Sequence, residues 1–236
     1  MIIGIWGQAG TGNSTLAVTL GKYLTKNGTV LIVYTDLTQP TLPTYVNSKE
    51  IEPSGSIGRA LNIGIQESTK YMHQDKKYKR LFYAGLTQQD TILSYEYGFE
   101  STVFAERFID NCKQIADHII IDLSSQRTDP FLPLVISRAS TILMPFEPNT
   151  KGLCRHNSCT ELIFQFKAMD KVMPIAAKVQ SFHDIPKFEK NTNIKFGGAI
   201  PYIKDVAMCL DTKKDVIDIY RYARQVIKIR KGLEVR

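Results

Sequence analysis

The chain has 236 residues, of which 43% are hydrophobic, so one α/β domain with a substantial core is expected. Its four cysteines are too few and too scattered for a disulfide framework, which favours a reducing, cytoplasmic setting. The sequence has neither signal-peptide character at its start nor an apolar run of about 18 residues, so secretion by that route and membrane spanning are not expected. A net charge of +7 favours an anionic partner such as DNA, anionic lipid or nucleotide.

The most informative stretch is a glycine-rich segment that follows the apolar run Met1–Trp6. Glycines allow backbone N–H groups to turn inward around phosphate oxygens. The spacing of leucines as far as Leu24 predicts a helix directly behind the segment, and the N-terminus of a helix attracts anions. The sequence therefore predicts a phosphate-binding loop that cradles a nucleotide with Gly7, Gln8, Ala9, Gly10, Thr11, Gly12, Asn13, Ser14 and Thr15.

One position departs from the pattern G-x-x-x-x-G-K-[ST] that such loops follow. Gly7, Gly12 and Ser14 match, with Ser14 at the Mg²⁺ position, but Asn13 stands where the lysine belongs. Losing an ammonium–phosphate hydrogen bond, worth about 1.5–3 kcal/mol, weakens nucleotide binding roughly ten- to a hundredfold. Hydrolysis should suffer more, because phosphoryl transfer depends on positioned positive groups. The alternative is an ordinary glycine-rich turn that binds nothing.

Two acidic residues follow predicted strands. The run Val30–Val33 predicts a buried strand that brings Asp36 to the same sheet edge as the loop. There Asp36 either holds a Mg²⁺ water, or orients an attacking water as a catalytic residue, or caps the next turn. The run Ile119–Ile121 predicts a central strand that ends in Asp122, where a carboxylate can coordinate Mg²⁺ through water.

The rest of the chain alternates between strand and helix patterns. Predicted helices cover residues 57–68, 103–116, 131–139 and 153–169, and further predicted strands cover 81–85, 141–144, 174–179 and 195–200. Such alternation indicates a single domain, 1–236, with a Rossmann-like, doubly wound, mostly parallel sheet and helices on both faces.

A basic amphipathic helix is predicted near the C-terminus, at about 213–231. Residues 213–236 hold eight Lys or Arg against three acids, a net charge of +5 (8 − 3). The helix can dock on the domain, lie on an anionic membrane or contact DNA phosphates. Its predicted apolar side comprises Val216, Ile219, Tyr220, Ala223, Val226 and Ile227, with Arg221, Arg224, Lys228 and Lys231 largely opposite.

These landmarks together resemble the ParA/MinD family of P-loop ATPases across nearly the whole chain. The order and spacing match at the loop, at Thr35-Asp36, at 121–124, at 145–148 with 151–153, and at 197–202. The resemblance implies a homodimer around ATP or ADP with Mg²⁺, and a nucleotide-dependent affinity for membrane or DNA. By position, the resemblance implies that Gly10–Thr15 would cradle the phosphates. The metal would be held by Ser14, Asp36 and Asp122. The nucleotide base would lie beside Pro201 and Tyr202.

Two departures from the family pattern shape the functional hypothesis. The family's signature lysine corresponds to Gln8, and the ordinary loop lysine corresponds to Asn13. In lacking both lysines, the chain resembles the branch of the family with degenerate loops that includes the TadZ and CpaE proteins. We therefore hypothesise a cytoplasmic protein with weak or absent ATPase activity that positions a pilus, secretion or conjugation assembly. A peripheral location at the membrane or cell pole is compatible with this hypothesis. The alternatives are an active partition ATPase whose lysine has been substituted, acting with a partition partner, and a DNA-binding module.

Overall fold

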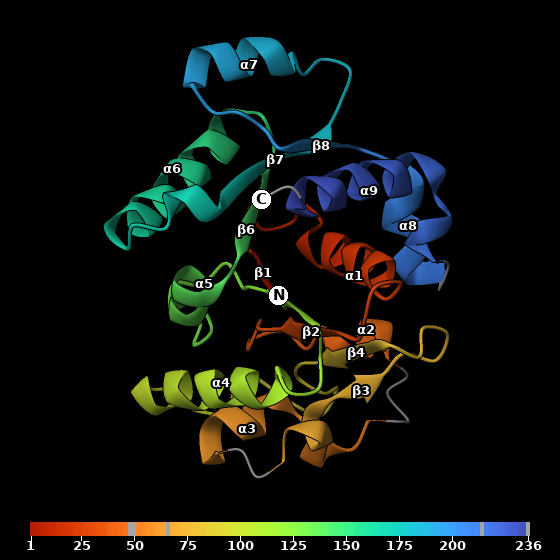
Figure 1. Cartoon of the computed structure of the whole chain (residues 1–236), viewed down its shortest axis with the longest axis vertical. Coiled ribbons are helices and arrows are strands. Elements are labelled where there is room, and N and C mark those ends of the chain that lie inside the picture. Colours follow the sequence, from red (N-terminus) through yellow and green to blue (C-terminus); the bar gives the residue numbers. More distant parts are fainter. Residues whose placement is uncertain (47–50, 65–66, 213–214, 235–236) are drawn as a thin grey trace.

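A computed structural model describes residues 1–46, 51–64, 67–212 and 215–234. Its strands form one sheet in the order β3-β4-β2-β5-β1-β6-β7-β8 (Figure 1). Every neighbouring pair runs parallel except β3 and β4, which are antiparallel. The strands are β1 Ile2–Ile5, β2 Val30–Tyr34, β3 His73–Gln74, β4 Leu81–Ala84, β5 His118–Asp122, β6 Thr141–Phe146, β7 Val172–Val179 and β8 Gly198–Pro201.

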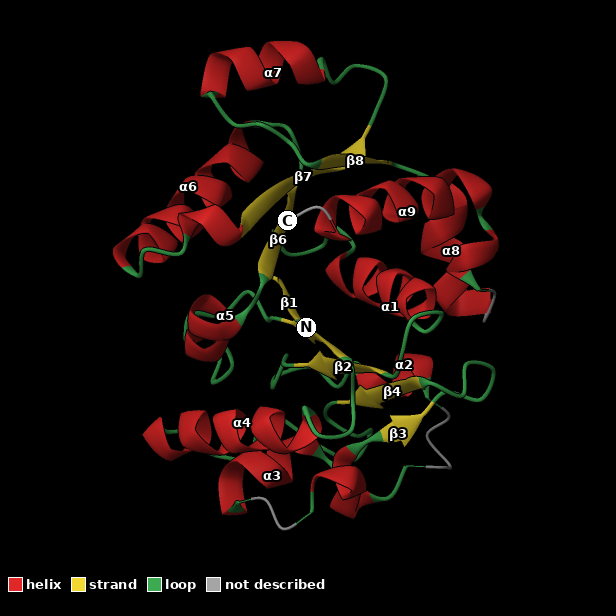
Figure 2. Ribbon diagram, viewed as in Figure 1, coloured by secondary structure: helices red, strands yellow, loops and turns green. Residues whose placement is uncertain are grey.

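Helices cover both faces of the sheet (Figure 2). One apolar core lies between helices α3, α4, α5 and α6 and one face of the sheet. A second apolar core lies between helices α1, α2, α8 and α9 and the other face. No helix of the described residues combines the length and the apolar character that a bilayer crossing needs. The helices are α1 Asn13–Leu24, α2 Leu42–Tyr45, α3 Ile57–Ile63, α4 Phe99–Cys112, α5 Leu132–Arg138, α6 Thr150–Gln165, α7 Ile185–Thr192, α8 Lys204–Thr212 and α9 Tyr220–Glu234, with short 3₁₀ turns at Pro53–Gly55, Ser68–Tyr71, Met169–Lys171 and Val216–Asp218.

The central strands explain why the chain folds this way. Every residue of β2 is buried, as is β5 after its first residue, because helices cover both faces of a parallel sheet. Register brings Tyr34 opposite Asp122, and β1 pairs with β5 on its other side. The predicted doubly wound, mostly parallel sheet is therefore confirmed, with the two-residue β3 as its antiparallel edge.

Several predicted boundaries are wrong. The helix predicted at 57–68 stops at Ile63, where Gly64 takes a positive φ of 89°. The helix predicted at 103–116 begins at Phe99 and ends at Cys112, which leaves Ile115 exposed. The last predicted strand, 195–200, occupies Gly198–Pro201.

The C-terminal helix also differs from its prediction. Lys213 lies outside the described residues, and a 3₁₀ turn at Val216–Asp218 precedes α9. This break changes the helical phase, so Tyr220 is exposed although it was assigned to the apolar side. The buried side of α9 instead consists of Tyr222, Ala223, Val226, Ile229 and Leu233. With these residues α9 docks on the sheet face beside β8 and α1.

Candidate nucleotide site

The predicted loop connects the end of β1 to the start of α1 at the carboxyl edge of the sheet. Gly10 and Gly12 have φ angles of 77° and 89°, a region that other residues rarely adopt. Gly12 caps α1 without any side-chain hydrogen bond. The first-turn N–H groups of α1, at Asn13, Ser14 and Thr15, therefore remain available to an anion.

Gly7 is required for a different reason, which is a close approach between backbones. A Cβ atom at Gly7 would lie 2.5 Å from the carbonyl oxygen of Pro145 and 2.4 Å from Oδ1 of Asn13. Gln8, the next residue, adds a hydrogen bond to the same carbonyl group, because its N–H donates to the Pro145 oxygen at 2.8 Å. The loop is thus packed against the end of β6.

Asn13 turns its side chain back into the loop. Its Nδ2 donates to the Gln8 carbonyl at 3.3 Å, and its Oδ1 lies 3.0 Å from the Thr11 hydroxyl. The Thr11 hydroxyl is also 2.7 Å from the Gln8 carbonyl oxygen. A neutral amide therefore closes the loop on itself at the position where an ammonium group would project toward phosphates.

Gln8 occupies the other position where the resemblance expects a lysine. Its side chain is buried, and its Oε1 accepts a hydrogen bond from the Glu147 N–H at 3.2 Å. The residue is therefore tied to the chain segment that follows β6. The buried Gln8 side chain therefore does not extend beyond the surface of the chain.

Asp122 ends β5 beside the first turn of α1. Its carboxylate is buried and hydrogen-bonds with the Ser14 side chain. Burial raises the pKa of Asp122 to about 7, and the negative charges of Asp129 and Asp36 act in the same direction. The structure thus brings together Ser14, Asp122 and Asp36, the three residues predicted for the metal.

Asp129 is a fourth polar residue of this site that the sequence reasoning missed. Its carboxylate accepts hydrogen bonds from the Thr35 hydroxyl, from the Ser124 N–H at 3.0 Å and from the Phe131 N–H at 2.9 Å. Burial raises the pKa of Asp129 to about 6, although these hydrogen bonds oppose the rise. Its place just before the predicted helix at Phe131 was the available signal, because aspartate is a preferred residue at helix starts.

Asp36 forms the turn that was one of its three predicted roles. Its Oδ1 accepts from the Thr38 N–H at 3.0 Å, the Thr38 hydroxyl at 2.6 Å and the Gln39 N–H at 3.1 Å. These contacts shape the segment that follows β2. Its roles in metal binding and in catalysis remain predictions.

Pro201 and Tyr202 lie at the same carboxyl edge, at the end of β8. Three strand spacings, about 14 Å, separate β8 from β1 in the sheet. The Tyr202 N–H donates to the Val179 carbonyl at 2.9 Å, and its ring is half exposed. Phe182, in the connection after β7, adds a second exposed aromatic ring at this edge that the sequence reasoning did not single out.

The oxygen-rich donor set at the loop suits Mg²⁺. Hydroxyl and carboxylate oxygens are the ligands that this hard cation prefers. The loop from Gly7 to Thr15 contains no Lys or Arg, so no side chain of the loop could neutralise phosphates in place of Mg²⁺. Ser14 with Asp122, and Asp36 from the next strand, are therefore the residues that could hold a nucleotide-bound metal.

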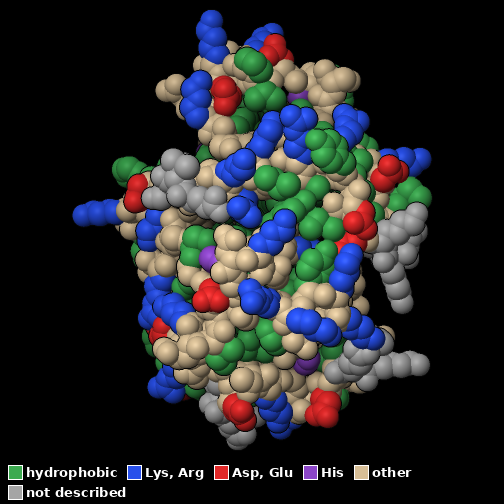
Figure 3. Space-filling view, turned by 45° about the vertical axis from the view of Figure 1, so that its right-hand side comes forward, with side chains coloured by type: hydrophobic (Ala, Val, Ile, Leu, Met, Phe, Trp, Pro, Cys, Tyr) green, Lys and Arg blue, Asp and Glu red, His purple; other side chains and the backbone are tan. Residues whose placement is uncertain are grey.

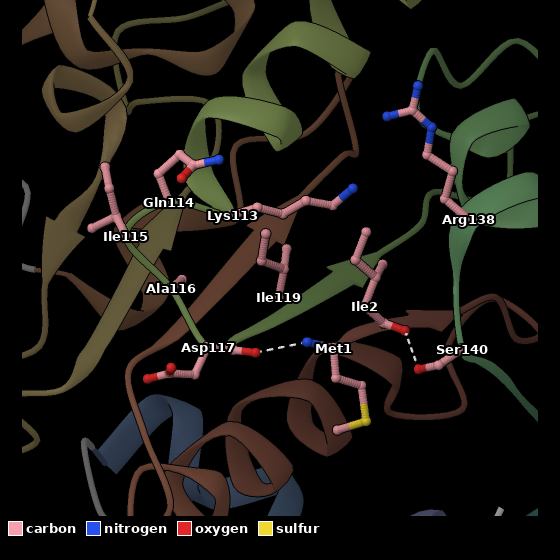
Figure 4. Close-up of a pocket in the computed structure, with 10 residues that line it drawn as sticks. All are labelled: Met1, Ile2, Lys113, Gln114, Ile115, Ala116, Asp117, Ile119, Arg138 and Ser140. Atoms are coloured by element: carbon pink, nitrogen blue, oxygen red, sulfur yellow. Dashed lines mark hydrogen bonds between the residues drawn. The ribbon is translucent and has the colours of Figure 1, made fainter.

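A hollow of about 440 Å³ lies at the opposite, amino edge of the sheet (Figure 4). Its polar wall is internally bonded: the Met1 amine donates to the Asp117 carbonyl at 2.7 Å, and the Ser140 hydroxyl donates to the Ile2 carbonyl at 2.7 Å. Arg138, which also lines it, is paired with Asp110 at 2.8 Å. None of the predicted site residues borders this hollow.

Comparison with solved structures identifies the fold. The chain is similar to a putative plasmid partition protein from Borrelia burgdorferi bound to AMPPNP, with a TM-score of 0.81 and 15% identity over 99% of this chain and 98% of that one. It is similar to the MinD cell division protein of Aquifex aeolicus, with a TM-score of 0.77 and 15% identity over 100% and 97% of the two chains. The septum site-determining protein MinD of Pyrococcus horikoshii, complexed with Mg-ADP, has a TM-score of 0.78 and 14% identity over 99% and 95%.

No family model and no curated protein sequence matches the chain. The structural likeness, at such low identity, shows the fold alone. That fold is the one shared by MinD and ParA-type P-loop ATPases, and the likeness covers 95–98% of the compared chains.

Proposed function

We propose that the chain is a nucleotide-binding protein of the ParA/MinD type that binds ATP or ADP with Mg²⁺ and hydrolyses ATP slowly or not at all. The observation that carries the proposal is the loop itself. The positive φ angles of its glycines and the uncapped start of α1 suit phosphate binding. The Asn13 amide, in contrast, uses both its oxygen and its nitrogen in hydrogen bonds within the loop. Bound Mg²⁺ would supply the positive charge that the loop lacks.

The chain's own residues would then divide the work. Backbone N–H groups from Gly10 to Thr15 would bind the phosphates, and the Ser14 hydroxyl would orient toward the metal. The buried Asp122 would hold the metal's water. Without a lysine, the developing charge on the transferred phosphoryl group would have no protein ammonium beside it, which is why slow turnover is expected.

The proposed role is to position a larger assembly, such as a pilus, secretion or conjugation apparatus, as a homodimer that acts at the membrane or cell pole. Support comes from similar structures described as MinD in complex with MinC and as a plasmid partition protein. Because Gln8 is buried against its own subunit, the proposed dimer would form without a lysine reaching the partner's nucleotide.

An active partition ATPase with a substituted lysine is the competing proposal, and Asn13→Lys separates the two. Turnover of ATP by the wild type and by Asn13→Lys is measured at saturating Mg²⁺. The positioning proposal predicts negligible turnover by both proteins, because Gln8 still lacks a charge. Strong turnover by Asn13→Lys alone would support the partition ATPase.

DNA binding through α9 is a second candidate function, favoured by one observation. Arg221, Arg224, Lys228 and Lys231 recur every three or four residues and are all exposed, opposite the buried side of the helix. Figure 3 shows Lys and Arg side chains spread over the face that carries α9. Such a stripe suits a regularly spaced row of phosphates.

A further inference from the structure

The connection between β4 and α4, together with the first residue of α4, presents the two most exposed apolar side chains of the described residues, Leu93 and Phe99. Leu93 and Phe99 are 90% and 85% exposed, and Ile92 is 68% exposed. Isolated exposed apolar residues are common, but three within eight residues of one segment are unusual. β4 ends at the carboxyl edge of the sheet, so this segment emerges at the same edge as the nucleotide loop.

A closed turn holds Ile92 and Leu93 outward. The Ser94 N–H donates to the Thr91 carbonyl at 2.9 Å, which closes a turn with Ile92 and Leu93 at its tip. The Thr91 N–H donates to the Ser94 hydroxyl at 2.8 Å, and the Leu93 N–H donates to the Thr91 hydroxyl at 3.3 Å. We call residues 91–94 the apolar turn.

Polar contacts, two of them buried, fasten the apolar turn to the domain. Asp90 accepts from the Thr87 N–H at 2.6 Å, from the Ser56 hydroxyl at 2.6 Å and from the Tyr95 hydroxyl at 2.8 Å. The Glu96 carbonyl accepts from the Asn62 amide at 2.7 Å. The turn is therefore ordered before any partner arrives, and an ordered segment loses less conformational entropy on binding.

The charge of this region indicates what the partner carries. Residues 81–106 contain four acids, Asp90, Glu96, Glu100 and Glu106, and no Lys or Arg, in a chain with a net charge of +7. Glu96 and Glu100 are exposed beside the apolar residues. Acidic flanks repel DNA and anionic lipid, and they would face each other across a twofold axis between two copies of this chain.

We propose that the apolar turn, with Phe99, Glu96 and Glu100, is a docking surface for a basic amphipathic helix of a partner protein. Ile92 and Leu93 act as preordered apolar anchors, and the two glutamates select a partner with Lys or Arg beside its apolar stripe. This surface is separate from the nucleotide loop, so the proposal stands independently of the proposed nucleotide binding.

The test uses the full chain and a labelled helical peptide of about four turns, made of Leu and Lys in amphipathic order, in fluorescence anisotropy. Ile92→Ser/Leu93→Ser should weaken binding at least about tenfold, and Glu96→Gln/Glu100→Gln about three- to tenfold. The matched control is Phe164→Ser/Phe166→Ser, at the exposed end of α6, which should bind within about twofold of the wild type. Circular dichroism verifies that each variant is folded.

Three results would overturn the proposal. One is equal binding of the Leu–Lys peptide by the wild type and by Ile92→Ser/Leu93→Ser. Another is equal binding of a matching Leu–Glu peptide, which would remove the charge selection. The third is that the turn variant loses self-association in light scattering, or loses co-sedimentation with vesicles, without losing peptide binding, because the occupant would then be a second copy or a membrane.

Discussion

The nucleotide loop and helix α9 both offer hydrogen-bond donors to anions, but by opposite means. The loop from Gly7 to Thr15 contains no Lys or Arg and depends on backbone N–H groups, with a neutral Asn13 folded into it. Helix α9 aligns four cationic side chains on its exposed side, from Arg221 to Lys231. The difference teaches that the loop itself supplies no cationic side chain, so anion binding there should require Mg²⁺ and depend little on salt.

The largest expected effect concerns the acids beside the loop. Asp122→Asn should raise the unfolding free energy of the nucleotide-free, Mg²⁺-free protein near pH 8 by up to about 4 kcal/mol, since the pKa of Asp122 is raised from 3.8 to about 7. The folded state binds more protons than the unfolded state between these values, so wild-type stability should fall as pH rises through this range. Urea unfolding at about pH 5 and about pH 8 measures both effects. An identical pH dependence in the variant would contradict the burial of this carboxylate.

Gly7→Ala should destabilise the protein by about 1–3 kcal/mol and abolish nucleotide binding. The added Cβ would collide with the Pro145 backbone carbonyl, which cannot move without shifting the end of β6. Thermal unfolding and nucleotide titration measure the two losses. The matched control is Gly98→Ala, because a Cβ at Gly98 meets no atom within 4 Å, and its stability should stay within about 0.5 kcal/mol of the wild type.

Neutralising the cationic side chains on the exposed side of α9 should weaken DNA binding without changing nucleotide binding at the loop. The triple variant Arg221→Gln/Arg224→Gln/Lys228→Gln should bind duplex DNA at least about tenfold more weakly at low salt, with a shallower salt dependence. Its stability should change by less than about 0.5 kcal/mol because these side chains are exposed. Nucleotide affinity should not change. If the wild type shows no DNA binding at low salt, the DNA-binding candidate is lost.

Asn13→Ala should have the smallest effect, about 1 kcal/mol of stability, because it removes the partly buried hydrogen bonds that close the loop. Chemical unfolding of Asn13→Ala, with Asn13→Asp as the variant of similar shape, measures the loss. A stability equal to that of the wild type would show that the amide does not hold the loop closed.

The parts of the fold that were predictable are those with continuous burial. Strands such as Val30–Tyr34 and His118–Asp122 carry unbroken aliphatic runs because helices cover both sheet faces. Helix α7 was missed because none of its residues is buried, so it leaves a weak apolar pattern. The phase of α9 was misjudged because a 3₁₀ turn interrupts the region, and no periodicity argument detects such a break.

Site residues could be predicted where the local backbone conformation requires one residue type. They could not be predicted where their role depends on contacts with residues far away in the sequence. Gly10 and Gly12 take the positive φ angles that a phosphate loop requires. The sequence could not reveal that Gln8 binds the segment after β6, because residues 8 and 147 are brought together only by the pairing of β1 with β6. Asp129 was missed for the same reason, since its partner Thr35 follows a different strand.

Calorimetric titration of the wild type with ATP, with and without Mg²⁺, tests the central claim most directly. We predict measurable binding that requires Mg²⁺ and changes little with salt, because backbone N–H groups and the metal, not side-chain cations, hold the phosphates. No detectable binding at millimolar nucleotide with Mg²⁺ would contradict the claim that this loop is a nucleotide cradle.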